Sequence, residues 1–185
     1  MNYCPNCAGT LTFSIPEGDH LPRHICNNCN TIHYSNPKVI TGCVPIYQDK
    51  VLLCKRAIEP RKGFWTLPAG FMENNESTLE GAMRETREEA NAEVKISHLY
   101  TITSIVHVNQ VQMLYLAYMD KPEYSISSES LEVELFSEED IPWDELAFPT
   151  IKKALTYYFS DRKNNHFPLR ENVVNRSMQQ PTKAV

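Results

Sequence analysis

The pattern of hydrophobic and polar positions predicts a series of strands between residues 38 and 136. Apolar runs rich in β-branched residues favour strands, and two of them, at 38–48 and 50–57, are separated by so short a turn that they predict a hairpin-like pair. Further runs of this kind lie at about 93–106, 110–119 and 131–136. Between them, residues 63–77 contain glycine and proline and are expected to form a loop.

Two segments have a helical period instead. The first runs from about Ser77 to Ala90, and its predicted core face contains Leu79, Ala82, Met83, Thr86 and Ala90. Ser77, followed three residues later by Glu80, is a capping-box pattern at the start of this helix. The second helix is expected at about 148–162, with Phe148, Ile151, Leu155, Tyr158 and Phe159 at helical spacing. Strands combined with two helices predict an α/β (α+β) fold rather than a doubly wound sheet.

The two ends of the chain differ from this central part. Residues 1–35 are polar, rich in turn residues and poor in large aliphatic side chains, so they need a metal or disulfides in order to fold. Residues 163–185 have no clear period and are expected to form an irregular or partly disordered tail. We therefore expect a small module at 1–35, a main domain at 36–162 and a tail at 163–185.

Composition narrows the class of protein. The chain has 185 residues, of which 42% are hydrophobic and 22% charged, as in a soluble globular protein. It has no apolar run near the roughly 18 residues that a membrane helix needs, and the start MNYCPNCAGT lacks an export signal, so we expect a cytoplasmic protein. The net charge of −5 argues against tight nucleic-acid binding, and would repel phosphorylated substrates unless bound cations reverse the local potential.

Four cysteines form two CxxC pairs separated by 18 residues, and they are Cys4, Cys7, Cys26 and Cys29. Two intervening residues let both sulfurs of a pair reach one ion, so this spacing is typical of a structural Zn²⁺ ribbon. Metal binding would supply the folding free energy that the composition cannot. His24 and His33 are alternative ligands, and a redox CxxC is a weaker interpretation. The remaining cysteines, Cys43 and Cys54, lie in apolar runs and are predicted to be core residues.

Three glutamates of the first predicted helix lie at positions i, i+3 and i+4, namely Glu85, Glu88 and Glu89. Carboxylates so close together repel one another and destabilise an ordinary surface helix. Divalent cations remove this repulsion, because Mg²⁺ and Mn²⁺ prefer oxygen ligands and can bridge a diphosphate. Arg84, one turn before Glu88, can hold that carboxylate by an ion pair. The alternative interpretation of such a charge run is a solvated face.

The sequence around this helix resembles the Nudix box. That motif has a glycine, five residues, a glutamate, seven residues, then Arg-Glu, an aliphatic residue, one further residue and Glu-Glu. The matching positions are Gly70, Glu76, Arg84, Glu85, Glu88 and Glu89. Two positions depart from the motif. Thr86 occupies the aliphatic position, and Asn91 replaces the closing glycine, where asparagine is the residue next most tolerant of a left-handed helix end.

This resemblance implies the Nudix fold, a mixed sheet between helices, with the metals held by a loop, a helix and a loop. It makes Glu85 and Glu89 candidates for direct ligands, and gives Glu88 the role of a ligand, a water-mediated bridge or the base. Glu76 is expected to brace the loop and helix. A base from elsewhere in the chain is also compatible with the family, and the candidates are Glu129, Glu132 and Glu134.

A CxxC ribbon followed by a Nudix box resembles two groups within the family. The NADH pyrophosphatases carry an SQPWPFP-type run after the box, which this sequence lacks. The strings VLLCKRAIEPRKGFWTLPAGFMENNEST, GAMRETREEA and SLEVELFSEEDIPWDELAF are similar to the ribbon-containing ADP-ribose and FAD pyrophosphatases. This second resemblance implies hydrolysis of FAD to FMN and AMP, or of ADP-ribose to AMP and ribose 5-phosphate.

The same resemblance implies a homodimer that acts on small nucleotide substrates. For substrate binding, Trp65 is a candidate for stacking on an adenine or flavin ring, and Arg56 or Arg61 for contacting a phosphate. Alternatively, Trp65 is a core aromatic and each arginine a surface cation. Alternative functions are NADH pyrophosphatase, RNA decapping, or a module that binds a nucleotide without turnover.

Overall fold

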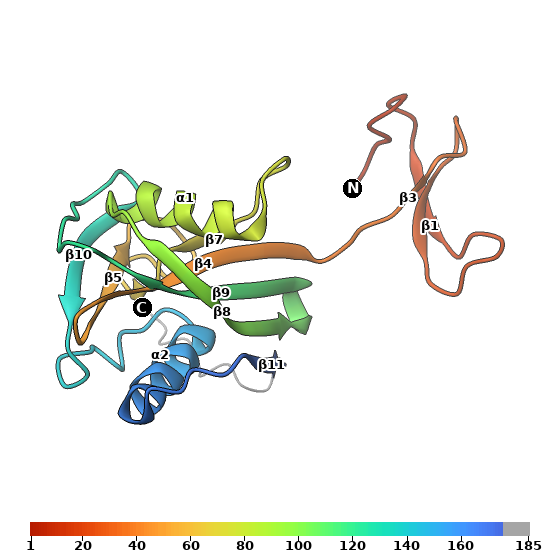
Figure 1. Cartoon of the computed structure of the whole chain (residues 1–185). Coiled ribbons are helices and arrows are strands. Elements are labelled where there is room, and N and C mark those ends of the chain that lie inside the picture. Colours follow the sequence, from red (N-terminus) through yellow and green to blue (C-terminus); the bar gives the residue numbers. More distant parts are fainter. Residues whose placement is uncertain (176–185) are drawn as a thin grey trace. The chain divides into compact units, whose positions relative to one another are not determined.

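The computed structural model describes residues 1–175 of the chain. It divides into two compact units, and the first is Met1–Pro37, with the second beginning at Lys38 (Figure 1). The first unit is a three-stranded antiparallel sheet in the order β1-β2-β3, with strands β1 (Leu11–Ser14), β2 (Arg23–Cys26) and β3 (Ile32–His33). Its large apolar side chains, such as Phe13 and Ile15, are exposed, while Cys4 and Cys26 are buried. Apart from Pro16, its buried positions are therefore cysteines, and it has no core of large apolar side chains.

The second unit is built on a mixed sheet with the strand order β10-β5-β4-β9-β8-β11. These strands are β4 (Lys38–Tyr47), β5 (Lys50–Arg56), β8 (Lys95–Ile105), β9 (Gln110–Tyr118), β10 (Ser130–Phe136) and β11 (Arg170–Val174). The pairs β4–β9 and β8–β11 are parallel, and the other neighbours are antiparallel. The strands predicted between residues 38 and 136 are confirmed. A short 3₁₀ helix, η1 (Val106–Val108), connects β8 to β9.

The segment predicted to be a loop contains two short strands that the sequence pattern does not indicate. Strand β6 (Trp65–Thr66) pairs with β5, and β7 (Ala69–Phe71) pairs with β4. The second pairing depends on Gly42 of β4, because a Cβ atom there would lie 2.3 Å from the Cβ of Ala69 and from the carbonyl oxygen of Pro68. The loop is thus drawn onto the sheet at a position where β4 has no side chain.

Two helices cover opposite faces of this sheet, as Figure 1 shows. Helix α1 (Thr78–Ala90) packs on the face that buries Cys43 and Cys54, and helix α2 (Pro149–Asp161) packs on the face that buries Leu114. The predicted mixed sheet between helices is confirmed, and so are both helices and the core positions of Cys43 and Cys54. Within residues 1–175, no helix combines the length and the apolar character needed to cross a bilayer.

The expectation of an irregular tail after residue 162 is wrong for the part that the structure describes. A 3₁₀ helix, η2 (Arg162–Asn164), is followed by β11, which pairs in parallel with β8 at the edge of the sheet. The segment RENVV is too polar and too short to predict a strand by its own pattern. Residues 176–185, which were also assigned to the tail, lie outside the described residues.

A cluster of polar side chains holds β11 in place. Asp161, at the end of α2, accepts hydrogen bonds from the Tyr100 hydroxyl at 2.6 Å and from Nη2 of Arg170 at 2.6 Å. The Arg170 guanidinium also lies over the ring of Tyr157, 4.5 Å from its centroid. Because Asp161 is only 8% exposed, its charge depends on these donors. Strand β11 is therefore fixed by side chains that come from α2 and β8.

Replacement of Arg170 tests this role. We expect Arg170→Met to lower the free energy of unfolding by about 2 kcal/mol, because it leaves the buried Asp161 carboxylate without its cation. The matched control is Arg87→Met, which breaks the exposed Arg87–Glu93 pair and should change stability by less than about 1 kcal/mol. Urea denaturation of both variants measures the difference. Equal losses in the two variants would contradict a specific role for Arg170.

Candidate functional site

Both ends of α1 are fixed by local interactions. Ser77 is the N-cap residue, and its hydroxyl accepts a hydrogen bond from the Glu80 amide at 3.2 Å, while the Glu80 carboxylate accepts from the Ser77 amide at 2.8 Å. The predicted capping box is thus confirmed. At the other end, Asn91 has a left-handed backbone with φ of 48°, and its backbone N–H donates to the carbonyl oxygen of Arg87. The asparagine that departs from the Nudix box therefore still ends the helix in a left-handed conformation.

The buried side of α1 includes two of its glutamates. Glu85 is 7% exposed and Glu89 is 8% exposed, whereas Leu79, predicted on the core face, is 39% exposed. The prediction for Leu79 is wrong, although those for Ala82, Thr86 and Ala90 are confirmed. The helix packs over β7, where Gly70 leaves space for the Glu85 carboxylate, since a Cβ atom on Gly70 would lie 2.3 Å from one of its oxygens. Two carboxylates thereby occupy part of the buried face.

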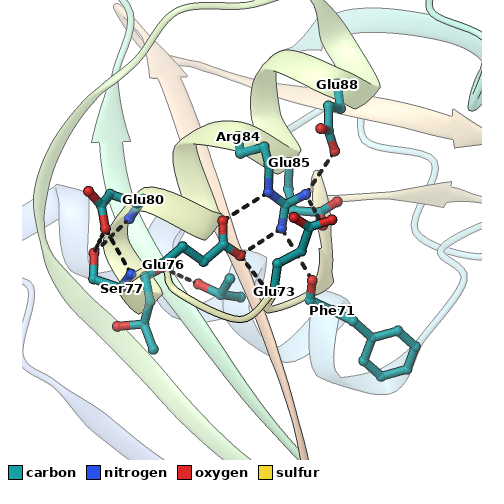
Figure 2. A network of polar contacts seen from close by, with 10 residues as sticks. Phe71, Glu73, Glu76, Ser77, Glu80, Arg84, Glu85 and Glu88 are labelled. Carbon is teal, nitrogen blue, oxygen red and sulfur yellow. Dashed lines mark hydrogen bonds and ion pairs between the residues drawn. The ribbon is translucent and has the colours of Figure 1, made fainter.

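Arg84 organises the glutamates around the start of α1 (Figure 2). Its guanidinium donates to both oxygens of Glu76, at 3.0 and 2.8 Å. Through Nη1 it also donates to Glu85 and to Glu88, both at 2.8 Å. The hydrogen bonds from Arg84 lower the pKa of Glu76 to about 2. The expected Arg84–Glu88 pair is present, and Glu76 also accepts from the Glu73 amide at 2.7 Å, as a bracing residue would.

Glu89 has a different environment. It accepts a hydrogen bond from the Ala69 amide at 3.3 Å, and no lysine or arginine among residues 1–175 forms an ion pair with it. Burial raises its pKa to about 8, and the nearby charge of Glu85 adds to this effect. Burial also raises the pKa of Glu85. Two buried carboxylates with incomplete charge compensation are a donor set that a hard divalent cation fits, because its charge would favour their ionised form.

Other elements bring further charges toward these carboxylates. Burial is the largest cause of the raised pKa of Glu89, and the charge of Glu85 comes next. The charge of Glu129, just before β10, adds a smaller rise, whereas Arg56 at the end of β5 lowers the pKa. Glu132 forms an ion pair with Lys55 at 2.7 Å, and Glu134 is exposed on the same strand. Of the three glutamates predicted as alternative bases, Glu129 thus contributes to the raised pKa of Glu89, while Glu132 is paired with Lys55.

The position of Trp65 favours its core alternative over stacking on a substrate. Its side chain is 5% exposed and lies edge-on to Phe136, with ring centroids 4.9 Å apart. Lys55 Nζ lies over its ring, 5.4 Å from the centroid. The free aromatic face that base stacking requires is thus covered, which the strand pattern could not reveal. Arg56 remains at the site, with Nε bound to the Pro60 carbonyl oxygen at 2.8 Å.

The four cysteines of the first unit converge on one point. One sulfur from each lies within 4.8 Å of all the others, with Cys4 and Cys29 at 3.7 Å and Cys7 and Cys26 at 3.4 Å. Tetrahedral zinc with bonds of about 2.3 Å places its sulfurs about 3.8 Å apart, so these thiols fit Zn²⁺. The hydroxyl of Thr31, 3.2 Å from Cys29 Sγ, is the main cause that lowers the pKa of that thiol to about 6.

Histidine is not needed to complete this site. His33 Nε2 lies 3.3 Å from Cys4 Sγ, at hydrogen-bonding distance from one of the four thiols. His24 faces His33 across β2 and β3, and its ring packs against Phe13 with centroids 4.9 Å apart. The two histidines therefore flank a complete set of four sulfur ligands.

Both units match models of known protein families. A zinc-ribbon model described as "Nudix N-terminal" matches residues 2–35, and a model described as "NUDIX domain" matches residues 36–159. A solved NUDIX hydrolase from Nitrosomonas europaea is 50% identical, with a TM-score of 0.92, and the match covers 95% of this chain and all of that one.

Two curated relatives carry more specific names. The NAD-capped RNA hydrolase NudC of Vibrio vulnificus is 26% identical over 77% of this chain and 53% of its own length. An ADP-ribose pyrophosphatase of Methanocaldococcus jannaschii is 35% identical over 38% of this chain and 42% of its own length. The chain thus spans about half the length of these curated relatives.

The cysteine site leads to a prediction about metal content. We expect the purified protein to contain about one zinc ion per chain, and Cys26→Ser to lose it, because three thiolates leave the tetrahedral site open. Cys54→Ala, which alters a buried cysteine of the second unit, should retain its zinc. Elemental analysis by mass spectrometry gives the ratio. Equal zinc content in both variants would show that the four thiols do not hold the ion.

Proposed function

The chain belongs to the Nudix hydrolase family, and from this premise we propose that it hydrolyses the pyrophosphate bond of nucleoside diphosphate-linked compounds with bound Mg²⁺ or Mn²⁺. The observation that carries the proposal is the burial of Glu85 and Glu89 on one helix, with Arg84 as the one cation paired to either of them among residues 1–175. A helix built only for stability would place apolar residues at these positions, since unpaired buried carboxylates are unfavourable.

Each residue of the acidic site has a proposed role. Glu85 and Glu89 hold the cation, with Glu88 as a further ligand or a water-mediated contact. When bound, the cation neutralises the diphosphate and lowers the pKa of a water molecule. Arg84 keeps the carboxylates of Glu85 and Glu88 oriented.

Two side chains outside α1 complete this arrangement. We propose Glu129 as the base that takes the proton from the attacking water, since the Ser127 hydroxyl links its backbone to that of Glu89 and Glu132 is already paired with Lys55. We propose that Arg56 contacts a phosphate group, and its effect on the pKa of Glu89 supports a position near that carboxylate. In this scheme Glu76 touches no reacting atom and keeps Arg84 in place.

For the substrate we propose FAD or ADP-ribose, which would give AMP together with FMN or ribose 5-phosphate. Support comes from the resemblance of residues 1–160 to ribbon-containing ADP-ribose and FAD pyrophosphatases, and from the relative named ADP-ribose pyrophosphatase. Both compounds share an adenosine diphosphate group, so one site of this kind can accept either. Because Trp65 is buried, we assign base recognition to none of the aromatic residues named above.

A second candidate is hydrolysis of NADH or of NAD-capped RNA. The relative named NAD-capped RNA hydrolase aligns with 77% of this chain, more than the ADP-ribose pyrophosphatase does. The net charge of −5 and the missing SQPWPFP-type run weigh against this candidate. The third alternative, nucleotide binding without turnover, leaves the buried carboxylates without a purpose.

We also infer a homodimer that acts in the cytoplasm on small nucleotide substrates rather than on long nucleic acids. The dimer rests on the resemblance to ribbon-bearing members of the family. The preference for small substrates rests on the acidic net charge, because a phosphate backbone binds basic surfaces. Size-exclusion chromatography with light scattering would determine the number of subunits.

Product analysis tests the proposed function. With Mg²⁺ and a panel of FAD, ADP-ribose, NADH, diadenosine polyphosphates, nucleoside triphosphates and capped RNA, we expect AMP from FAD or ADP-ribose. Glu89→Gln should lower kcat by at least about a hundredfold, because it removes a charged ligand of the cation. The control Glu93→Gln alters an exposed glutamate paired with Arg87 and should keep full activity.

Two outcomes would contradict the proposal. Equal rates for the wild type and Glu89→Gln would exclude the acidic helix as the site of catalysis. No product from any compound with Mg²⁺ or Mn²⁺, from folded protein that contains zinc, would instead support a nucleotide-binding module. Release of NMN from NAD-capped RNA, leaving RNA with a 5′-monophosphate, and no AMP from FAD or ADP-ribose would favour the second candidate substrate.

A further inference from the structure

The segment of residues 125–129 lies along the end of α1. The Ser125 amide donates to the carbonyl oxygen of Ala90 at 2.9 Å, and Nδ2 of Asn91 donates to the carbonyl oxygen of Ile126 at 3.2 Å. The hydroxyl of Ser127 donates to the carbonyl oxygen of Glu89 at 3.1 Å. Residues far apart in the sequence are thus joined where the helix presents its last carboxylate.

Ser127 makes a second contact, which links the end of α1 to Glu129. Its Oγ accepts a hydrogen bond from the Glu129 amide at 3.1 Å, so one hydroxyl connects the backbone of Glu89 to that of Glu129. The Glu129 carbonyl oxygen in turn accepts from the Ala57 amide at 3.0 Å, next to Arg56. Glu129 is exposed and precedes an irregularity in the β10–β5 pairing, so the ladder alone does not fix it.

We propose that Ser127 is a positioning residue that sets Glu129 relative to Glu89, with Asn91 as a second point of attachment. The inference rests on the proposed function of the acidic site, because it concerns where that site receives a carboxylate from outside α1. Two hydrogen bonds of one hydroxyl thus separate the backbone of Glu129 from that of Glu89, the last glutamate of α1. The Nudix box has glycine at the position of Asn91, so the side-chain bond to the 125–129 segment is an addition of this chain.

Mn²⁺ binding to the full-length, zinc-loaded protein tests the proposal without any substrate. Free Mn²⁺ is measured by electron paramagnetic resonance during a titration. We expect Ser127→Ala to bind Mn²⁺ at the acidic site about threefold more weakly than the wild type, because the negative charge of Glu129, the proposed base, is then held less firmly beside the bound cation. Asn91→Gly, which restores the residue of the motif, should produce a smaller loss in the same direction. Ser128→Ala, at the exposed neighbouring serine, is the matched control and should match the wild type.

A double-mutant cycle separates positioning from general loosening of the fold. If Ser127 acts through Glu129, adding Ser127→Ala to Glu129→Gln should weaken Mn²⁺ binding no further. Additive losses, or a Ser127→Ala variant that binds as Ser128→Ala does, would overturn the proposal. Thermal melting of every variant shows whether weaker Mn²⁺ binding comes from unfolding. If Ser127→Ala unfolds, Asn91→Gly decides instead: weaker Mn²⁺ binding supports the proposal, and binding equal to the wild type overturns it.

Catalytic rates test the proposed function, and Mn²⁺ binding tests the role of Ser127, so the failure of one can be told from the failure of the other. On any substrate that is turned over, Ser127→Ala should lower kcat with little change in KM. If no compound is hydrolysed, the proposed function fails, while the Mn²⁺ titration still supports or contradicts the position of Glu129.

Discussion

The guanidinium group of Arg84 donates five hydrogen bonds, and the arrangement of the acidic site depends on them. Glutamates at i, i+3 and i+4 would otherwise repel one another. The planar, fork-shaped donor set of arginine can satisfy several carboxylates at once, which a lysine ammonium cannot do with the same geometry. Its bonds go to Glu76, Glu85, Glu88 and the Phe71 carbonyl oxygen, so the loop before α1 and the helix form one unit (Figure 2). Glu89 lies outside this network, and its charge is left for a cation to balance.

Close packing of the backbone explains why carboxylates can be buried here at all. A Cβ atom on Gly70 would meet the Glu85 carboxylate, and one on Gly81 would lie 2.7 Å from Oε1 of Glu76. The glycines thus give room to glutamates rather than only allowing turns. Arg56, at the end of β5, and Glu129, just before β10, affect the pKa of Glu89, so segments distant in the sequence come near α1. The zinc ribbon at residues 1–35 is stabilised differently, because metal-binding thiols take the place of the apolar core that its sequence lacks.

Local signals accounted for much of the fold and for part of the site. The capping box at Ser77, the periodicity of both helices and the apolar runs of the strands are short-range patterns, and the structure contains the elements that they predict. Long-range packing decided the rest. Leu79 is exposed because Glu85 and Glu89 take part of the buried face, and Trp65 is buried because Phe136 and Lys55 cover it. Strand β11 is held by the Arg170–Asp161 contact, and the Glu129 amide bonds to Ser127, and no sequence period records either interaction.

We propose that a bound divalent cation compensates the charges of the buried Glu85 and Glu89. Anomalous diffraction from crystals soaked in Mn²⁺ tests it most directly, with the ribbon zinc as an internal reference recorded at its own absorption edge. The account predicts a manganese peak at coordinating distance, about 2.2 Å, from carboxylate oxygens of both glutamates, with Arg84 still bound to Glu76. Absence of manganese at these two carboxylates, in crystals whose zinc peak is clear, would contradict the account and leave the buried pair without an explanation.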